Sequence, residues 1–310
     1  MGLVTSKAIL DPANRDGYGV GAFNVNNLEF AKAVVRAAVD ERSPIIVQVS
    51  EGAIAYAGLR EISGMVRTIA DSVQVPVALH LDHGRNYATI VDCIRNGFTS
   101  VMIDGSHLPF EENIALTAKV VETAHAVGVS VEAELGKLAG IEDNIAVAER
   151  DAILTDPDEA REFVERTAVD ALAVAIGTSH GPHKFKGDPV LALDLVTEIK
   201  KRVPIPLVLH GASGVSPDTV MLGEKYGAKW AGSRGIPDES IVEAIRRGIN
   251  KVNIDTDMRL AFIASIRETL GTHPEITDPR DILKPASAAV RAVAAAKMRL
   301  FGSSSRVPMA

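Results

Sequence analysis

The stretch that decides the fold is VPVALHLDHGRNYATIVDCIRNGFTSVMID, residues 75–104. It begins with an apolar run that ends on Asp82 and His83, and it closes with a second apolar run that ends on Asp104. Between the two runs, YATIVDCIRNG has the composition and length of a helix. Short buried strands joined through a helix are typical of the βα unit of a parallel sheet.

The same arrangement recurs along the whole chain of 310 residues. Apolar runs, most of them introduced by Pro or Gly, alternate with helix-length stretches, and no Ser- or Pro-rich linker divides the chain. This alternation favours one (β/α)8 TIM barrel over two doubly wound sheets. The expected strands are residues 19–25, 44–50, 75–83, 99–104, 129–135, 171–177, 205–211 and 249–255.

We therefore expect a single α/β domain with a C-terminal helical extension. The barrel should occupy residues 19–270, and the extension should occupy residues 278–301. The remaining stretch, GSSSRVPMA at 302–310, has the composition of a flexible tail.

The overall composition restricts the class of protein. Hydrophobic residues make up 46% of the chain and charged residues 24%, which excludes disordered and low-complexity proteins. The net charge of -7 argues against a general nucleic-acid or membrane partner. The single cysteine, Cys93, fits a reducing compartment, and the sequence has neither a membrane-length apolar run nor a secretory leader pattern. We expect a cytoplasmic protein.

Polar residues stand at the ends of seven of the expected strands, as the active site of a (β/α)8 barrel requires. The exception is the strand at 171–177, where the nearest such residue is His180, a few positions beyond its end. The polar residues at or beside the other strand ends are Asn24, Ser50, Asp82, His83, Asp104, Glu134, His210, Asn253 and Asp255.

Three histidines near strand ends, His83, His180 and His210, predict a metal centre. Three imidazoles with one open position are typical of catalytic zinc. The alternative is that each histidine only makes local hydrogen bonds. Asp82, next to His83, is a candidate proton carrier, and its alternative role is to orient a histidine ligand. Asp104 and Glu134 are candidates for binding a second cation or for orienting ligands.

Two glycine-containing segments, GTSHG at 177–181 and HGAS at 210–213, offer backbone N–H groups to an anion. NIDTD at 253–257 combines a strand end with a helix start, where barrels often bind phosphate. Lys184 can supply a positive charge. Each segment alone is also compatible with an ordinary capped turn, but together they predict a phosphorylated ligand.

Four motifs in order, HLDHG at 80–84, GTSHG at 177–181, LHGAS at 209–213 and NIDTD at 253–257, resemble those of class II, metal-dependent ketose-bisphosphate aldolases. The resemblance extends from GVGAFNVNN near the N-terminus to DPR at 278–280. It implies reversible cleavage of fructose 1,6-bisphosphate to dihydroxyacetone phosphate and glyceraldehyde 3-phosphate. Tagatose 1,6-bisphosphate, or another aldol product of dihydroxyacetone phosphate, is the alternative substrate.

The resemblance also assigns chemical roles. It implies that His83, His180 and His210 bind a catalytic Zn²⁺, or another divalent metal, that stabilises an enediolate. It makes Asp82 the acid/base at the C4 hydroxyl. It makes Glu142, in the segment after the fifth strand, the acid/base at the enediolate carbon.

Contacts with the sugar bisphosphate follow from the same resemblance. Gly181, Gly211 and Ser213 also resemble a monovalent-cation site for Na⁺ or K⁺. Arg280 resembles an arginine that reaches the distal phosphate of a neighbouring subunit, which implies a homodimer or homotetramer. Whether Lys184 or Lys186 contacts phosphate stays open. The implied substrate contacts are Asn24, Ser50, Gly181, Lys184, Gly211, Ser213, Asn253, Asp255, Thr256 and Arg280.

Two other classes of protein fit the sequence less well. A metal-dependent hydrolase on this barrel should close its first strand with a His-x-His pair, whereas this strand closes on Asn24. A sugar-phosphate binding protein without catalysis should have lost Asp82, Glu142 or a zinc histidine, and all of these are present.

Overall fold

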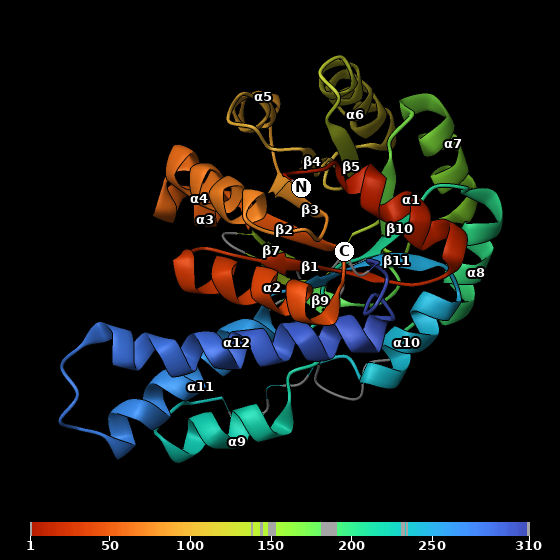
Figure 1. Cartoon of the computed structure of the whole chain (residues 1–310). Coiled ribbons are helices and arrows are strands. Elements are labelled where there is room, and N and C mark those ends of the chain that lie inside the picture. Colours follow the sequence, from red (N-terminus) through yellow and green to blue (C-terminus); the bar gives the residue numbers. More distant parts are fainter. Residues whose placement is uncertain are drawn as a thin grey trace.

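Eight parallel strands close into a barrel, and each strand comes from one of the eight expected runs (Figure 1). Around the barrel the order is β1-β11-β10-β8-β5-β4-β3-β2, so the first and last strands pair and close the sheet. The TIM-barrel prediction is confirmed. The strands are β1 (Val20–Asn24), β2 (Ile45–Ser50), β3 (Val77–Gly84), β4 (Ser100–Ile103), β5 (Ser130–Leu135), β8 (Ala171–Val174), β10 (Leu207–Leu209) and β11 (Ile249–Ile254).

The computed structural model describes residues 2–137, 139–142, 145–147, 153–180, 191–230, 233 and 235–308. For residues 139–142, 145–147 and 180 it describes the backbone alone. Gly181, Lys184 and Lys186 lie outside the described residues.

Helices cover the outside of the barrel (Figure 1). Several begin at capping side chains: Asn27, Asn86 and Asp156 each accept hydrogen bonds from backbone N–H groups of the first turn. The connections after β2 and β10 each hold two helices, of which the first are α3 (Glu51–Ala57) and α9 (Pro217–Lys225). The other helices between strands are α2 (Leu28–Glu41), α4 (Leu59–Asp71), α5 (Tyr87–Arg95), α6 (Phe110–His125), α7 (Pro157–Thr167), α8 (Leu193–Arg202) and α10 (Asp238–Arg246).

The core has two parts. The larger part lies between the barrel and its helices, where alternate strand residues such as Val47, Leu79 and Leu209 are fully buried. The smaller part fills the barrel interior, where Ile46 and Val208 pack with residues of α1 (Ser6–Asp16). This first helix closes the amino-terminal end of the barrel and leaves the carboxyl ends of the strands for the site.

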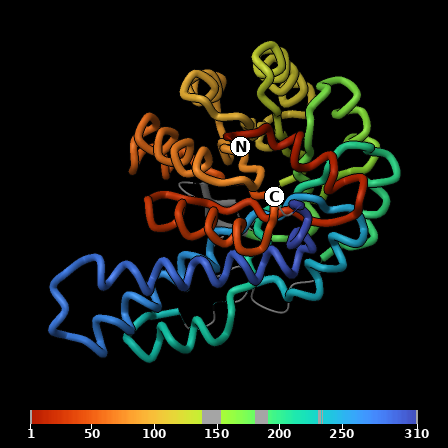
Figure 2. Tube along the Cα trace, in the orientation of Figure 1, coloured from red at the N-terminus to blue at the C-terminus, as the bar shows by residue number. Residues whose placement is uncertain are grey.

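The C-terminal helices form a projecting arm beside the barrel (Figure 2). Helix α11 (Thr256–Thr272) follows β11, and α12 (Pro279–Phe301) packs against both α11 and α2. The segment after α12 differs from the free tail that we expected. Ser303 is fully buried and accepts a hydrogen bond of 2.8 Å from Ser43, and the Val307 amide donates to the Arg42 carbonyl at 2.9 Å.

A second, small sheet joins the connections after β5 and β8. Its strands are β6 (Ala139–Glu142), β7 (Ile145–Val147) and β9 (Ser179–His180). The β6 strand pairs antiparallel with β7 and parallel with β9, where Gly140 faces His180. The sixth barrel strand ends at Val174, earlier than expected, because the backbone groups that follow bond outside the barrel sheet. Ala175 bonds to Thr155, and the Ile176 carbonyl accepts the amide of Ala192.

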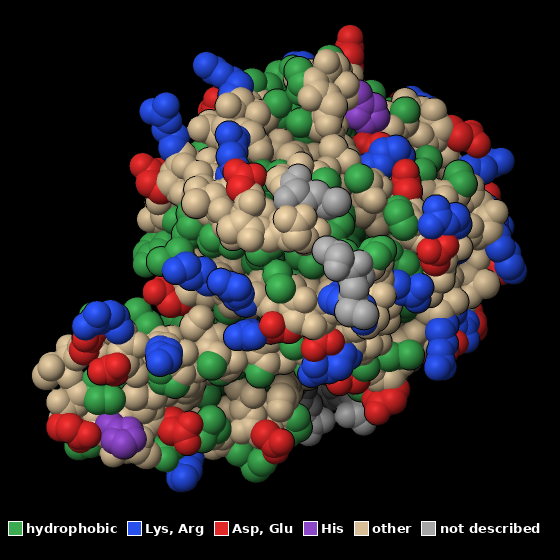
Figure 3. Space-filling model, in the orientation of Figure 1, with side chains coloured by type: hydrophobic (Ala, Val, Ile, Leu, Met, Phe, Trp, Pro, Cys, Tyr) green, Lys and Arg blue, Asp and Glu red, His purple; other side chains and the backbone are tan. Residues whose placement is uncertain are grey.

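The surface in Figure 3 carries Lys and Arg side chains interspersed with Asp and Glu side chains. Among the described residues, none of the helices combines the length and the apolar character that crossing a bilayer requires.

Candidate active site

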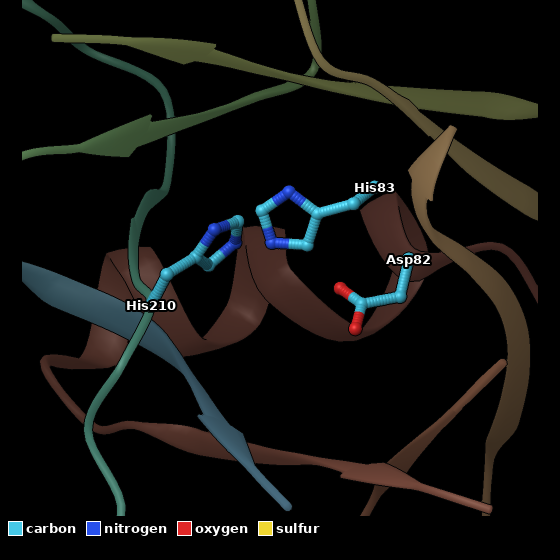
Figure 4. A group of neighbouring side chains, drawn as sticks. All are labelled: Asp82, His83 and His210. Atoms are coloured by element: carbon cyan, nitrogen blue, oxygen red, sulfur yellow. The ribbon is translucent and has the colours of Figure 1, made fainter. Parts of the chain in front are cut away.

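Three of the predicted site residues meet at the carboxyl ends of the strands. Asp82 and His83 come from β3, and His210 directly follows β10. One ligand atom from each lies within 4.8 Å of the others. Figure 4 shows the two imidazoles next to each other with the Asp82 carboxylate beside them. The ring centres are 4.6 Å apart, and the ring planes meet edge-on at 62°.

An irregular backbone brings both Asp82 and His83 to this site. On a regular strand, neighbouring side chains point to opposite faces. Here the register with β4 shifts between Leu81 and Gly84, and His83 has a φ of 47° in the left-handed region. The bulge re-aims His83, at a conformational cost of about 1–3 kcal/mol. His80, which precedes the bulge, is fully buried in the barrel interior.

Three side-chain amides hold the Asp82 carboxylate, which is 1% exposed. Asn24 and Gln48 donate to Oδ2 at 2.7 and 3.2 Å, and Asn253 donates to Oδ1 at 3.2 Å. Asn24 and Asn253, both predicted as substrate contacts, therefore hold the Asp82 carboxylate in place through hydrogen bonds. Sequence reasoning missed Gln48, although a polar residue inside the apolar run PIIVQVS was a usable signal.

Carboxylates surround the two histidines. The Nε2 of His210 donates to Glu132 Oε1 at 3.0 Å, and its Nδ1 lies 3.2 Å from Glu134 Oε2. Burial opposes a charge on this ring, but hydrogen bonds to the two carboxylates raise the pKa of His210 to about 9.

On the other side, His83 Nδ1 lies 2.9 Å from Asp104 Oδ2 and 3.7 Å from Glu134 Oε2. Burial would raise the pKa of Asp104, but the hydrogen bond from His83 holds it well below its usual value. His83, Asp104 and Glu134 form a second group of ligand atoms within 4.8 Å of one another.

The donor set fits a divalent metal ion. Imidazole nitrogens and carboxylate oxygens are the ligands that Zn²⁺ takes in catalytic sites. His83 and His210 converge on one point of the site. Asp104 contacts Nδ1 of His83 and Glu132 contacts Nε2 of His210, as carboxylates commonly do around metal-binding histidines. Of the third predicted ligand, His180, the structure describes only the backbone, in β9.

The loop after β10 approaches β9 closely. At Gly211, where φ is 62°, an added Cβ would lie 2.6 Å from the Ser179 carbonyl oxygen, so only glycine fits. Val215 also has a left-handed φ, of 49°. The buried Asp257 stabilises this turn by accepting the amides of Gly214 and Val215 at 2.9 and 2.6 Å.

The phosphate candidates come partly together. Ser213, buried in this loop, accepts a long hydrogen bond of 3.5 Å from the backbone amide of Asp255, which precedes Thr256 at the start of α11. Ser50 ends β2, and its hydroxyl accepts the Ala53 amide at 3.2 Å. Ser50 thus ends β2, Ser213 follows β10 and Asp255 follows β11, all at the carboxyl ends of barrel strands.

Arg280 is not part of the site within one chain. It lies in the first turn of α12, its side chain is 88% exposed, and its guanidinium pairs with Asp278. The α12 helix begins at the outer end of the projecting arm (Figure 2).

Comparison with known proteins places the chain in a family. The family model "Fructose-bisphosphate aldolase class-II" matches residues 4–306. A fructose-bisphosphate aldolase from Thermus caldophilus is 54% identical over 304 residues, which are 98% of this chain and 99% of the relative. A fructose-bisphosphate aldolase from Helicobacter pylori strain 26695 is 49% identical over 98% of this chain and 100% of its own length.

Solved structures agree. The crystal structure of the YdjI aldolase from Escherichia coli K12 superimposes with a TM-score of 0.82 at 33% identity, covering 99% of this chain and 100% of that one. A structure described as a putative fructose-1,6-bisphosphate aldolase from Coccidioides immitis has a TM-score of 0.80 at 29% identity, over 97% and 96% of the two chains.

Proposed function

Because this chain belongs to the class II fructose-bisphosphate aldolase family, we propose that it cleaves fructose 1,6-bisphosphate reversibly to dihydroxyacetone phosphate and glyceraldehyde 3-phosphate. The observation that carries the proposal is the meeting of Asp82, His83 and His210 at the carboxyl end of the barrel. A carboxylate beside a metal-binding pair of imidazoles suits proton transfer next to a developing negative charge.

The proposed cofactor is Zn²⁺, held by His83, His210 and His180. When bound, the ion acts as a Lewis acid that stabilises the negative charge of the enediolate. Asp104 orients His83 through the contact described above, and Asp104 and Glu134 are also the candidates for a second cation. The family is metal-dependent, which supports the cofactor class.

Asp82 is proposed as the proton carrier at the C4 hydroxyl. During cleavage its carboxylate takes the hydroxyl proton as the C3–C4 bond breaks, and it returns the proton in condensation. The amides of Asn24, Gln48 and Asn253 fix both oxygens. The carboxylate is therefore aimed before substrate arrives, which is how a positioned base lowers the barrier.

Glu142 is proposed as the second proton carrier, because the enediolate carbon and the C4 hydroxyl are different atoms. The family resemblance supports this role. The backbone of β6, which carries Glu142, pairs with β9, so the segment is joined to the one that carries His180.

Phosphate groups are proposed to bind at two ends of the site. Neutral donors and backbone amides suit one phosphate near Gly211 and Ser213, where Na⁺ or K⁺ is also proposed together with Gly181. Arg280 of a neighbouring subunit is proposed for the distal phosphate, so the protein should form a homodimer or homotetramer. The other proposed substrate contacts are Asn24, Ser50, Lys184, Asn253, Asp255 and Thr256.

We place the enzyme in the cytoplasm, where its only cysteine, Cys93, stays reduced. Burial raises the pKa of this thiol to about 12, which makes it unreactive.

The test is a coupled assay that detects each triose phosphate separately. Fructose 1,6-bisphosphate should yield the two products in equal amounts, and Asp82→Asn should lower kcat for this cleavage roughly 10²–10⁴-fold. Turnover of tagatose 1,6-bisphosphate at a higher kcat/KM than fructose 1,6-bisphosphate would move the substrate to the alternative. The absence of cleavage of either sugar by a zinc-loaded protein would contradict the proposal.

A further inference from the structure

A charged layer lies inside the barrel directly beneath the site, and the proposed function does not use it. Lys251 of β11 and His80 of β3 are fully buried, and Glu132 of β5 is 1% exposed. Barrel interiors of this fold are mainly packed with branched apolar side chains. A lysine with no exposed surface is therefore unusual and calls for a physical explanation.

Lys251 holds both oxygens of one carboxylate. Its Nζ lies 2.9 Å from Glu132 Oε1 and 2.8 Å from Oε2. Oε1 also accepts the hydrogen bond of 3.0 Å from His210 Nε2. The three groups form a continuous row, from the barrel interior at Lys251 to the imidazole at the site.

His80 lies beside this row and contacts both Glu132 and Lys251. Its Nε2 lies 3.6 Å from Glu132 Oε2 and 3.5 Å from Lys251 Nζ. Its Nδ1 is hydrogen-bonded to Ser100 at 2.7 Å, which anchors the ring to β4. The Glu132 carboxylate is thus held on more than one side.

This arrangement determines which nitrogen of His210 faces the site. An ionised carboxylate only accepts hydrogen bonds, so Nε2 must carry a proton. In the neutral ring, Nδ1 then has the lone pair, and this nitrogen lies beside Glu134 in the group with His83. A histidine binds a metal through the nitrogen that its other hydrogen bond leaves unprotonated.

We propose that Lys251 is a positioning residue for metal binding, which acts by fixing Glu132 and, through it, the tautomer and orientation of His210. The inference rests on the proposed function, whose metal it concerns. It assigns a role to a residue that touches neither metal nor substrate.

The competing explanation is that the ion pair merely fills the interior. Replacing a buried ion pair with neutral side chains of similar shape is often neutral for stability. Thermal stability alone therefore does not separate the two explanations. Metal affinity does, because filling space predicts no change in it.

The experiment measures the Zn²⁺ dissociation constant of chelator-stripped protein by competition with a chromophoric chelator. The variants are Lys251→Met, Glu132→Gln and their combination. The matched control is Lys200→Met, which removes a lysine bonded to Asn14 and to the Ile205 carbonyl, at the closed end of the barrel. Circular dichroism and the visible spectrum of Co²⁺-loaded protein report folding and ligand geometry.

We expect Lys251→Met and Glu132→Gln each to weaken Zn²⁺ binding about 10–100-fold and to alter the Co²⁺ spectrum. The combination should bind no more weakly than the worse single variant, because Lys251 acts through Glu132. The control should match wild type. Zn²⁺ binding by Lys251→Met within twofold of wild type, or tighter, would overturn the inference, as would losses that multiply in the combination.

If Lys251→Met does not fold, the test compares the Zn²⁺ affinity of Glu132→Gln with that of the double variant, which is neutral at both positions. Equal Zn²⁺ affinities of these two proteins support the inference. Weaker Zn²⁺ binding by the double variant overturns it. A wild-type protein without measurable Zn²⁺ affinity would refute the proposed cofactor itself, whereas a wild-type affinity kept by the variants refutes only the positioning role.

Discussion

Replacing Asp82 with Asn should separate carbon–carbon cleavage from the chemistry at the enediolate carbon. The substitution removes the proton acceptor but keeps the shape of the side chain. Because general acid–base catalysis contributes roughly 10²–10⁴-fold, kcat for cleavage should fall by that factor, or by about 3–5 kcal/mol in barrier height.

The stability cost of this substitution follows from the hydrogen bonds. Both carboxylate oxygens accept from amides: Asn24 and Gln48 at one oxygen and Asn253 at the other. Whichever way the new amide turns, its NH₂ group faces at least one donor that loses its acceptor. We expect a loss of about 1–3 kcal/mol in the free energy of unfolding.

The assay compares two reactions of the same variant. Cleavage of fructose 1,6-bisphosphate is followed by a coupled assay, and exchange of a dihydroxyacetone phosphate C–H proton with solvent deuterium is followed by NMR. Asp82→Asn should lose cleavage and keep exchange near the wild-type rate, with unchanged zinc content, while Glu142→Gln should lose both. Equal loss of exchange in Asp82→Asn, or loss of its metal, would refute the assignment of Asp82 to the C4 hydroxyl.

Further predictions concern other parts of the site. Arg280→Ala should raise KM for the bisphosphate about 10–100-fold, because a charged contact with phosphate is lost. It should change the free energy of unfolding by no more than about 0.5 kcal/mol, because the side chain is 88% exposed. An unchanged KM would contradict the phosphate assignment. Zn²⁺ binding to chelator-stripped protein should tighten as the pH rises from 7 to 9, because the pKa of His210 is raised to about 9 and its proton competes with the metal. Chelator competition across this pH range measures the direction of the change. A Zn²⁺ affinity independent of pH would contradict the role of His210 as a ligand that must lose a proton. Gly211→Ala should lower the free energy of unfolding by about 1–3 kcal/mol, because the added Cβ would meet the Ser179 carbonyl oxygen at 2.6 Å; a melting temperature equal to wild type would show that the loop relaxes freely.

The barrel and the centre of the site were predictable because both follow from local patterns. Apolar runs that end on polar residues locate the strands, and parallel strands present their carboxyl ends at one edge. His83 and His210 therefore had to lie at the same opening, although 127 positions separate them in the chain (210 minus 83).

The charged layer in the interior was not predictable in the same way. The sequence places Lys251 early in a strand and Glu132 within another, and nothing local says that these strands face each other across the barrel. The bulge at His83 is likewise a property of the pairing between β3 and β4. Both features depend on contacts between residues far apart in the sequence.

For the end of the chain, the sequence predicted a flexible tail where the structure has an ordered one. GSSSR is typical of a flexible tail, but Ser303 and Ser43 form a buried hydrogen bond across a sequence separation of 260 residues. Small polar side chains form no sequence pattern that indicates whether a segment is ordered. Their partners, here at the end of α2, determine whether they are ordered.

The most direct test of metal-dependent aldol cleavage at this site is the rate of fructose 1,6-bisphosphate cleavage by one preparation in three states: as isolated, after treatment with EDTA, and after Zn²⁺ is restored. Activity that is lost to the chelator and returns with Zn²⁺ is the predicted result. Cleavage that continues at full rate in metal-stripped protein would contradict the roles given to His83, His180 and His210.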